Sequence, residues 1–434
     1  MPNVFVMGLN DFNRTLLARI RGAEEYAFHS LVANELVEEP ERYDVRGILA
    51  AAEAELAAFP GSVDAIVGYI DIPVGALLPI LCQAHGLPTP TLESVLRCQH
   101  KYWARLEQAR VVPQHIPRYA GVDPFAPRAA ARPPLDYPFW LKPVKSAGSY
   151  LGFRIANGRQ YRESLAVIRD NIARLAEPFD FLVDYAGVRE GPVALDFSQC
   201  LAEELIGGRQ CTLEGYILQG EVVVYGVLDS IRDRNRSTFL RYQYPSQLPR
   251  GVQARMVRIA QRLLPAVGLD HTAFNMEFFW DRRRDHVWLL ETNTRVSQSH
   301  SDLFDLVDGA SNHQAMVELG LGRRPAMPHR EGPYATAAKF FLRHQADGVV
   351  EAVPTAADIE RVQAAFPGSR VKINVRPGDR LSELREQDSY SYDLGWVFLG
   401  AHSPVALGQA FARARELLPF RIRGVEVRAW AKGD

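Results

Sequence analysis

The segment 289–295, with the sequence Leu-Leu-Glu-Thr-Asn-Thr-Arg, constrains the fold of this chain more than any other segment. Side chains two positions apart in an extended strand point to the same face, so Glu291 and Asn293 converge there. A second strand-like run, 274–280, adds Glu277 among apolar residues. Turning such polar groups inward costs several kcal/mol unless something compensates them.

A divalent cation is the compensation that fits these residue types. Carboxylate and amide oxygens, with no nearby Cys or paired His, suit Mg²⁺ or Mn²⁺ rather than zinc. We therefore predict a metal site on Glu277, Glu291 and Asn293, with a solvated strand face as the alternative. Because a cation of this kind commonly carries the phosphates of a nucleotide, the pattern favours a phosphate-handling enzyme.

Bulk composition argues against several classes of protein. The length of 434 residues allows about two to four structural units. A net charge of -1 gives no electrostatic reason to bind nucleic acid or a membrane surface. The four cysteines are scattered without a CxxC pair, and no apolar run reaches the ~18 residues of a membrane span. The chain enters a strand-like segment at Val4 with no signal-peptide pattern, so a cytoplasmic protein with reduced thiols is expected.

The first 95 residues alternate strand and helix signals, which favours a small parallel α/β layer. The expected strands are 4–8 and 63–69, and a helical pattern runs from Asp71 to His85. Gly8 is followed by Leu-Asn-Asp-Phe-Asn and not by GxGxxG, so a dinucleotide-binding dehydrogenase is the least favoured reading.

The rest of the chain divides into two further parts. A helix is expected over 97–110, the Pro- and Ala-rich stretch 113–138 predicts a connecting loop, and segments 210–218 and 221–228 form a hairpin. From Gly332 a new α+β pattern begins, with strands near 335–342, 370–375 and 396–400 and a helix over 404–418. We therefore predict domains at 1–95, 96–330 (with a lid subdomain at about 139–205) and 331–434.

Lysine is scarce in this chain, since only six of its 50 Lys and Arg residues are lysine. A retained lysine can mark a place that needs a compact ammonium group, although drift explains the bias equally well. Lys142 stands in a short strand directly before the small-residue loop 146–152, whose backbone amides could wrap an anion. A plain turn is the alternative, and no Walker A pattern occurs in the sequence.

Two further segments complete the pattern. In Ala202–Gly208 an apolar strand runs into a Gly-Gly hinge, where a flat base could bond to the backbone around Glu204 to Ile206. An amphipathic edge strand explains the same residues. Arg295 follows the predicted metal ligands and could stabilise charge on a transferring phosphoryl group or a tetrahedral adduct. A salt bridge to Glu277 or Glu291 is the structural alternative.

In their order along the chain, these pieces resemble the ATP-grasp superfamily. The resemblance rests on Lys101, Phe139–Gly152, Ala202–Glu214, Phe274–Phe279 and Leu289–Arg295, and it covers roughly residues 1–330. It implies an ATP-grasp fold, with an N-terminal parallel α/β domain before it and a C-terminal α+β domain after it. ATP would lie between two α+β subdomains, and a substrate carboxylate would attack the γ-phosphate to give an acylphosphate that an amine intercepts.

The resemblance also implies a role for each residue. Lys101, Lys142, Ser146, Gly148 and Ser149 would bind phosphates, and Glu203, Glu204, Leu205 and Ile206 would contact adenosine. Mg²⁺ or Mn²⁺ would sit on Glu277, Glu291 and Asn293. Lys142, Ser149 and Arg295 would act in catalysis. This chemistry fits the residues present, because phosphoryl transfer needs positioning and charge neutralisation more than a protein nucleophile.

Two branches of the superfamily are similar to this chain. Carboxylate–amine ligases, including L-amino acid ligases, match the Ser-Ala-Gly-Ser loop, Glu214 and the 245–249 segment. Biotin carboxylase has a Val-Glu-His sequence where this chain has Gln298-Ser299-His300. Only the histidine is retained, and Ser299 stands at the position of the glutamate. The expected lysine within 222–245 and a Met-Lys-Met biotin attachment site are both missing.

The expected activity is therefore an ATP-dependent ligase acting on small carboxylate and amine substrates, with a homodimer as the default assembly. A biotin carboxylase-like carboxylase and a non-catalytic nucleotide-binding regulator are the alternatives. Candidate substrate contacts, each of which could equally be structural, are Asp229, Arg232, Arg241, Ser299 and His300. For His300 a structural role in the core is the favoured reading.

Overall fold

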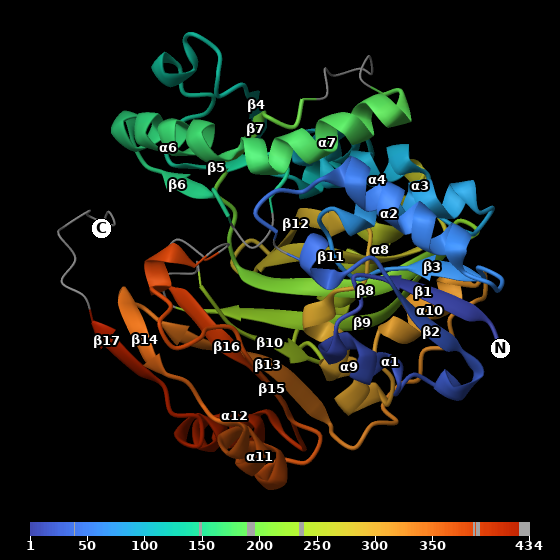
Figure 1. Ribbon diagram of the computed structural model, residues 1–434. Coiled ribbons are helices and arrows are strands. Elements are labelled where there is room, and N and C mark those ends of the chain that lie inside the picture. Colours follow the sequence, from blue (N-terminus) through green and yellow to red (C-terminus); the bar gives the residue numbers. More distant parts are fainter. Residues whose placement is uncertain are drawn as a thin grey trace.

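The protein is described by a computed structural model that covers residues 1–38, 40–146, 150–188, 196–233, 238–384, 387 and 391–424. Figure 1 shows an N-terminal unit on the right, a lid of helices and strands at the top, and a C-terminal unit at the lower left, all around a long central sheet. Within the described ranges, none of the helices combines the length and apolar character of a membrane span.

The N-terminal unit is a three-stranded parallel sheet in the order β2-β1-β3, as predicted from the strand–helix alternation. Its elements are β1 (Asn3–Met7), α1 (Asp11–Leu17), β2 (Ala27–Leu31), α2 (Val45–Ala58), β3 (Ala65–Val67) and α3 (Val74–Ala84). The predicted helix from Asp71 begins only at Val74, which leaves Asp71 in the β3–α3 loop. That loop faces the candidate site.

The helix predicted over 97–110 is in fact two helices, α4 (Leu92–Gln99) and α5 (Lys101–Val111). They meet at His100, whose side chain accepts a hydrogen bond from the backbone amide of Trp103 and so caps α5. The break makes Lys101 the first residue of α5. Its backbone amide donates to the carbonyl of Val144 at 2.8 Å, which fixes the helix start against the lid.

The lid contains a four-stranded antiparallel sheet in the order β4-β7-β5-β6. Its elements are β4 (Tyr119–Val122), β5 (Phe139–Pro143), β6 (Phe153–Ile155), α6 (Gly158–Asn171), α7 (Ala173–Ala186) and β7 (Cys200–Glu204). The prediction that 113–138 is only a connecting loop was therefore wrong. Pairing of β4 with β7 overrides the low strand propensity of this Pro- and Ala-rich stretch, so the lid sheet begins at Tyr119.

The central sheet has eight strands in the order β12-β11-β8-β9-β10-β13-β16-β15. The strands before the predicted boundary at 330 are β8 (Arg209–Leu218), β9 (Glu221–Arg232), β10 (Phe239–Tyr244), β11 (Thr272–Asp281) and β12 (His286–Asn293). Those after it are β13 (Thr336–His344), β15 (Arg370–Ile373) and β16 (Tyr392–Ala401). Because β10 pairs with β13, the C-terminal strands extend the same sheet.

Helices cover both faces of this sheet. α8 (Arg250–Ala266) packs with the side chains of β8 and β11 in one apolar cluster, on the face opposite Glu277 and Glu291. α9 (Ser301–Asp308) and α10 (His313–Gly320) lie on the same side as the N-terminal unit. The C-terminal unit adds β14 (Gly348–Ala352), α11 (Ala356–Ala365), α12 (Pro404–Glu416) and β17 (Arg421–Gly424), with a core of its own.

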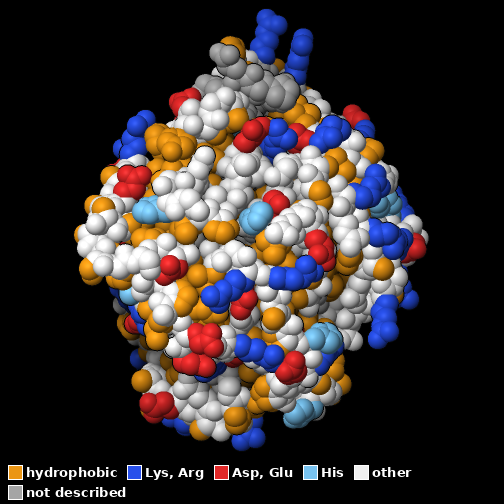
Figure 2. All heavy atoms as spheres, turned by 90° about the vertical axis from the view of Figure 1, so that its right-hand side faces the viewer, with side chains coloured by type: hydrophobic (Ala, Val, Ile, Leu, Met, Phe, Trp, Pro, Cys, Tyr) orange, Lys and Arg blue, Asp and Glu red, His pale blue; other side chains and the backbone are white. Residues whose placement is uncertain are grey.

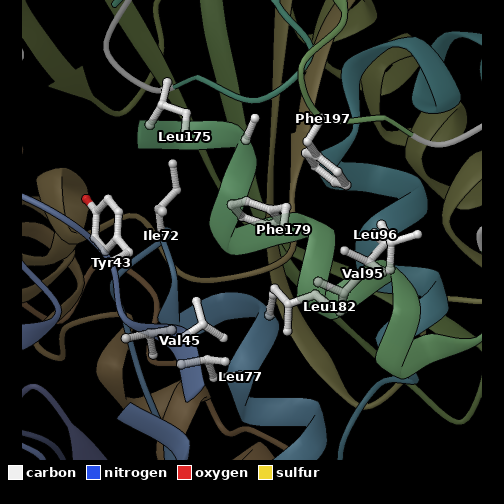
Figure 3. Packing of buried hydrophobic residues seen from close by; sticks show 14 of the residues in the cluster. Tyr43, Val45, Ile72, Leu77, Val95, Leu96, Leu175, Phe179, Leu182 and Phe197 are labelled. Carbon is white, nitrogen blue, oxygen red and sulfur yellow. The ribbon is translucent and has the colours of Figure 1, made fainter. Parts of the chain in front are cut away.

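The lid and the N-terminal unit share one buried apolar cluster. Leu175, Phe179 and Leu182 of α7 pack with Ile72 and Leu77 of the N-terminal unit (Figure 3). This packing holds the lid against the β3–α3 loop. On the outside, Figure 2 shows the face that lies to the right in Figure 1, where Lys and Arg side chains alternate with Asp and Glu.

Candidate active site

The predicted metal ligands lie on one face of the β11–β12 pair. Glu277 is paired with Glu291, and Asn275 is paired with Asn293, so all four side chains point to the same side of the sheet. The side-chain amide nitrogen of Asn293 donates to Oδ1 of Asn275 at 2.9 Å, which leaves the Asn293 amide oxygen to reach a cation. Two carboxylates and one amide oxygen therefore converge as the sequence predicts.

The pKa values of the Glu277 and Glu291 carboxyl groups are shifted in opposite directions. Burial and the charge of Glu291 raise the pKa of Glu277, whose Oε2 accepts a hydrogen bond from Gln210 Nε2 at 2.8 Å. Burial opposes ionisation of Glu291 as well, but Lys101 and Lys142 outweigh it and lower the pKa of Glu291. Two facing carboxylates in a buried site fit a hard divalent cation, which would relieve their repulsion. Within the described ranges no three His, Cys, Asp or Glu side chains form a metal-binding cluster, so a cation at this place would need the amide oxygen of Asn293 as its third protein ligand.

Two predicted phosphate ligands reach the same place. Lys101 Nζ lies 2.8 Å from Glu291 Oε1 and donates to the carbonyl of Ser146 at 2.9 Å. Lys142 of β5 lies 2.6 Å from Glu203 Oε2 and contributes to the field at Glu291. Both lysines are buried and paired with carboxylates. The structure thus brings together lysines from a helix and from the lid.

Glu203 was predicted to contact adenosine, but its carboxylate has other partners. Besides Lys142, it accepts from Arg105 Nε at 2.5 Å. Burial disfavours the charge, yet these two cations hold the pKa of Glu203 at about 2. Arg105 also donates to the carbonyl of Leu290 at 2.8 Å, next to Glu291. In this arrangement Glu203 positions Lys142, and Arg105 ties α5 to both sheets.

The other hinge residues lie at the junction of the lid sheet and the central sheet. The backbone amide of Glu204 donates to the carbonyl of Arg118, and its carboxylate accepts from Arg118 Nε at 3.2 Å. Leu205 and Ile206 are half-buried. A cavity of about 240 Å³ opens beside Glu204 and Leu205. Contact of Glu204, Leu205 and Ile206 with a nucleotide stays a prediction.

The lid loop is only partly described. Ser146 is buried, whereas Gly148 and Ser149 lie outside the described residues. Lys145, directly before the loop, pairs with Asp71 of the N-terminal unit at 3.0 Å. Arg295 also pairs with Asp71, at 3.5 Å, and not with Glu277 or Glu291. One N-terminal carboxylate therefore holds both the predicted catalytic arginine and the end of the lid strand.

Sequence reasoning missed Asp71, Arg105, Gln210 and the ion-pair role of Lys145. No local motif marks any of them, because their partners come from distant segments. The scarcity of lysine was the one available signal for Lys145.

The candidate substrate contacts divide between the two faces of the central sheet. Asp229 and Arg241 lie on the face opposite Glu291. There Asp229 accepts from Arg209, Ser246 and the backbone of Gln247, and Arg241 stacks on Phe340. These two are not brought to the site.

Arg232, Ser299 and His300 lie on the face that carries the site. Arg232 stacks over Phe279 of β11 and lowers the pKa of Glu277 against the larger effects of burial and Glu291. Ser299 Oγ accepts from Lys339 at 2.9 Å, and His300 Nδ1 lies 2.7 Å from Glu214 Oε1.

Comparison with known proteins bears on the fold that carries these residues. Residues 135–301 match the family model described as ATP-grasp domain. The uncharacterized protein y4rH of Sinorhizobium fredii (strain NBRC 101917 / NGR234) is 27% identical over 388 residues, which is 88% of this chain and 69% of that protein.

Among solved structures, an L-amino acid ligase from Bacillus licheniformis has a TM-score of 0.71 at 15% identity, covering 98% of this chain and 99% of that one. The N5-carboxyaminoimidazole ribonucleotide synthetase from Thermotoga maritima has a TM-score of 0.62 at 13% identity, covering 97% and 99%. A biotin carboxylase from Campylobacter jejuni has a TM-score of 0.60 at 15% identity, covering 97% and 92%. The chain contains an ATP-grasp domain and has the ATP-grasp fold, so the prediction of the fold is confirmed.

Proposed function

Since this chain contains an ATP-grasp domain, we propose that it is an ATP-dependent carboxylate–amine ligase. ATP would phosphorylate a substrate carboxylate, and an amine would displace the phosphate to form an amide or peptide bond, with release of ADP and phosphate. The observation that carries the proposal is the convergence of Glu277, Glu291 and Asn293 with Lys101 on one face of the central sheet. The similarity to an L-amino acid ligase over nearly the whole chain supports this branch.

The charges of the site suit a nucleotide with its cation. Glu277, Glu291 and Asn293 would hold Mg²⁺ or Mn²⁺, which neutralises phosphate charge during transfer. Lys101 is paired with Glu291 while no phosphate is bound, and it would move to the phosphates as Glu291 turns to the cation. Each group then exchanges one charged partner for another, which avoids leaving a buried charge uncompensated.

The remaining residues would position the reacting groups. Arg105 and Glu203 hold Lys142 beside the same phosphates. Asp71 holds Arg295 at the end of β12, where the guanidinium can stabilise charge on the acylphosphate and the tetrahedral intermediate. The lid segment 146–152 would exclude water, which otherwise hydrolyses the activated acid.

A screen for phosphate release tests the proposal. The protein would be incubated with ATP, Mg²⁺ and a matrix of carboxylic acids against amino acids and other amines, and products would be identified by mass. We expect ADP formation that depends on one acid and one amine, together with a product of the mass of their amide. The Glu291→Gln variant serves as the negative control.

Two outcomes would overturn the ligase assignment. ADP formation that requires bicarbonate and biotin, with no amide product, identifies a carboxylase. Tight ATP binding without turnover across the whole matrix identifies a nucleotide-binding regulator.

A further inference from the structure

A histidine and a buried carboxylate form a dyad next to the candidate metal site. His300 ends the short turn Gln298–His300, and its Nδ1 lies 2.7 Å from Glu214 Oε1. Glu214 has no solvent exposure, and its other oxygen accepts a hydrogen bond from the hydroxyl of Tyr225 at 3.3 Å. A carboxylate buried in this way needs both donors, so the proton of a neutral His300 resides on Nδ1.

The opposite nitrogen of the ring is therefore the basic one. Among the described residues, none makes a hydrogen bond to His300 Nε2, and the side chain keeps a small exposed area of 5%. Tyr242 packs edge-on against the ring with centroids 5.1 Å apart. A histidine fixed in one tautomer by a carboxylate, with its second nitrogen unengaged, has the arrangement of a general base.

The dyad stands on the face of the sheet that carries the metal ligands. Glu214 of β8 is paired directly with Asn275 of β11, which is paired with Asn293 of β12. Neighbouring strands are about 4.8 Å apart, so the dyad lies within one or two strands of the predicted cation. The dyad is therefore close enough to contact a substrate that binds beside this cation.

Charged and titratable groups reach this region from five strands of the sheet. They are Glu214 from β8, Tyr225 and Arg232 from β9, Tyr242 from β10, Glu277 from β11 and, through Ser299, Lys339 from β13. The two tyrosines stay protonated, since burial raises both of their pKa values.

We propose that His300, oriented by Glu214, is the general base that removes a proton from the ammonium group of the acceptor substrate. This inference rests on the proposed ligase function and names the acceptor as a protonated amine. Nε2 takes the proton from the ammonium group, and the freed lone pair attacks the acyl carbon. The new C–N bond forms as the C–O bond to phosphate breaks with its electron pair on the leaving phosphate. The departing phosphate takes the second proton from the nitrogen, which leaves a neutral amide, and the proton on His300 then passes to water.

A base is needed because an aliphatic amine is protonated at neutral pH and has no lone pair to donate. Hydroxylamine is uncharged at the same pH and can attack the acylphosphate without one. The two nucleophiles therefore separate the role of His300 from that of the residues that make the acylphosphate.

The test compares both nucleophiles in wild type and in His300→Asn. The asparagine amide can still donate to Glu214, so the variant keeps the hydrogen bond but loses the base. We expect acid-dependent ATP cleavage and hydroxamate formation at the wild-type rate, while amide formation with the amine falls by about 100-fold. Raising the pH toward the pKa of the amine should restore much of that loss. The exposed His329 provides the matched control, since His329→Asn should leave both products unchanged.

Glu214→Gln gives a second measurement that does not depend on the first variant folding. Glu214 is a positioning residue, so its loss should lower the ratio of amide to hydroxamate while hydroxamate formation persists. An equal fall in both products, or an unchanged ratio in both variants, overturns the base assignment. If none of the acids in the panel gives hydroxamate with the wild-type protein, the ligase proposal fails, and this inference fails with it.

Discussion

Lys101 Nζ lies 2.8 Å from Glu291 Oε1, so a predicted phosphate ligand and a predicted metal ligand neutralise each other across the site. The contact joins the first residue of α5 to β12, and both side chains belong to the site that we assign to nucleotide and cation. Binding of the two should be coupled, because each releases the group that the other needs.

Loss of the Glu291 charge should stop catalysis without unfolding the protein. Glu291→Gln keeps the size of the side chain but removes a metal ligand, so ATP turnover should fall by about 100-fold or more. Lys142→Ala should have a similar effect. The matched control is Glu221→Gln, which removes an exposed carboxylate paired with Arg324 on the surface. Steady-state ADP release and circular dichroism check the result, and normal turnover in Glu291→Gln would refute the site.

Divalent cations should stabilise the protein through Glu277. Because burial and Glu291 raise the folded-state pKa of Glu277, its ionisation costs more in the folded protein than in the unfolded chain, and this penalty appears as the pH rises above the ordinary value of 4.5. Glu277→Gln should therefore be more stable than wild type at pH 7 in EDTA, with the difference vanishing near pH 4. Added Mg²⁺ should raise the thermal midpoint of wild type and not of the variant. An equal Mg²⁺ shift in both proteins would contradict the metal assignment.

The Asp71 carboxylate should contribute strongly to stability at neutral pH. Burial disfavours its charge, but Lys145 and Arg295 hold the pKa of Asp71 well below its ordinary value. The contribution is therefore complete above the ordinary pKa of 3.8 and is lost as the pH falls through the folded value. Asp71→Asn should cost about 3 kcal/mol at pH 7, because it leaves buried cations without a partner.

Urea unfolding measures that loss. The double variant Asp71→Asn/Lys145→Met should recover part of it, since the uncompensated ammonium group is gone. A double variant less stable than Asp71→Asn would show that the pair is not coupled in this way.

The Lys339 ammonium group should destabilise the fold below neutral pH. Its Nζ lies 3.3 Å from the centre of the Trp396 ring and, within the described part of the chain, has no carboxylate at ion-pair distance. Burial lowers the pKa of Lys339 to about 7. The folded state then disfavours the charged form, so the penalty is present below pH 7 and disappears as the pH rises toward 10.5.

Lys339→Met should thus be more stable than wild type at pH 6, and the two should be alike near pH 10. Chemical denaturation at both pH values tests this. A constant difference at the two pH values would show that the side chain acts through packing alone.

The shared face of Glu291 and Asn293 could be predicted from the sequence because the signal is local. Glu291 and Asn293 are two apart in an apolar strand, and the period of a strand alone places them on one face. The hairpin at 210–228 was predicted for the same reason, since its two strands have a clear periodicity.

The rest depends on contacts between distant segments. Nothing near Asp71 indicates that Lys145 and Arg295 will meet it, because the contact depends on how the N-terminal unit packs against the lid. Strand β4 was not predicted because it lies in a Pro- and Ala-rich stretch, and it is stabilised by its pairing with β7. The break at His100 was missed because the apolar rhythm continues across it.

The pairing of β10 with β13 limits how this protein can be shortened. Tyr242 faces Lys339 across that pair, well past the boundary that the sequence indicates. A chain cut near residue 330 would present a long row of unsatisfied backbone amides and carbonyls along β10, which is a template for intermolecular strand addition. The isolated part before residue 330 should therefore aggregate on expression.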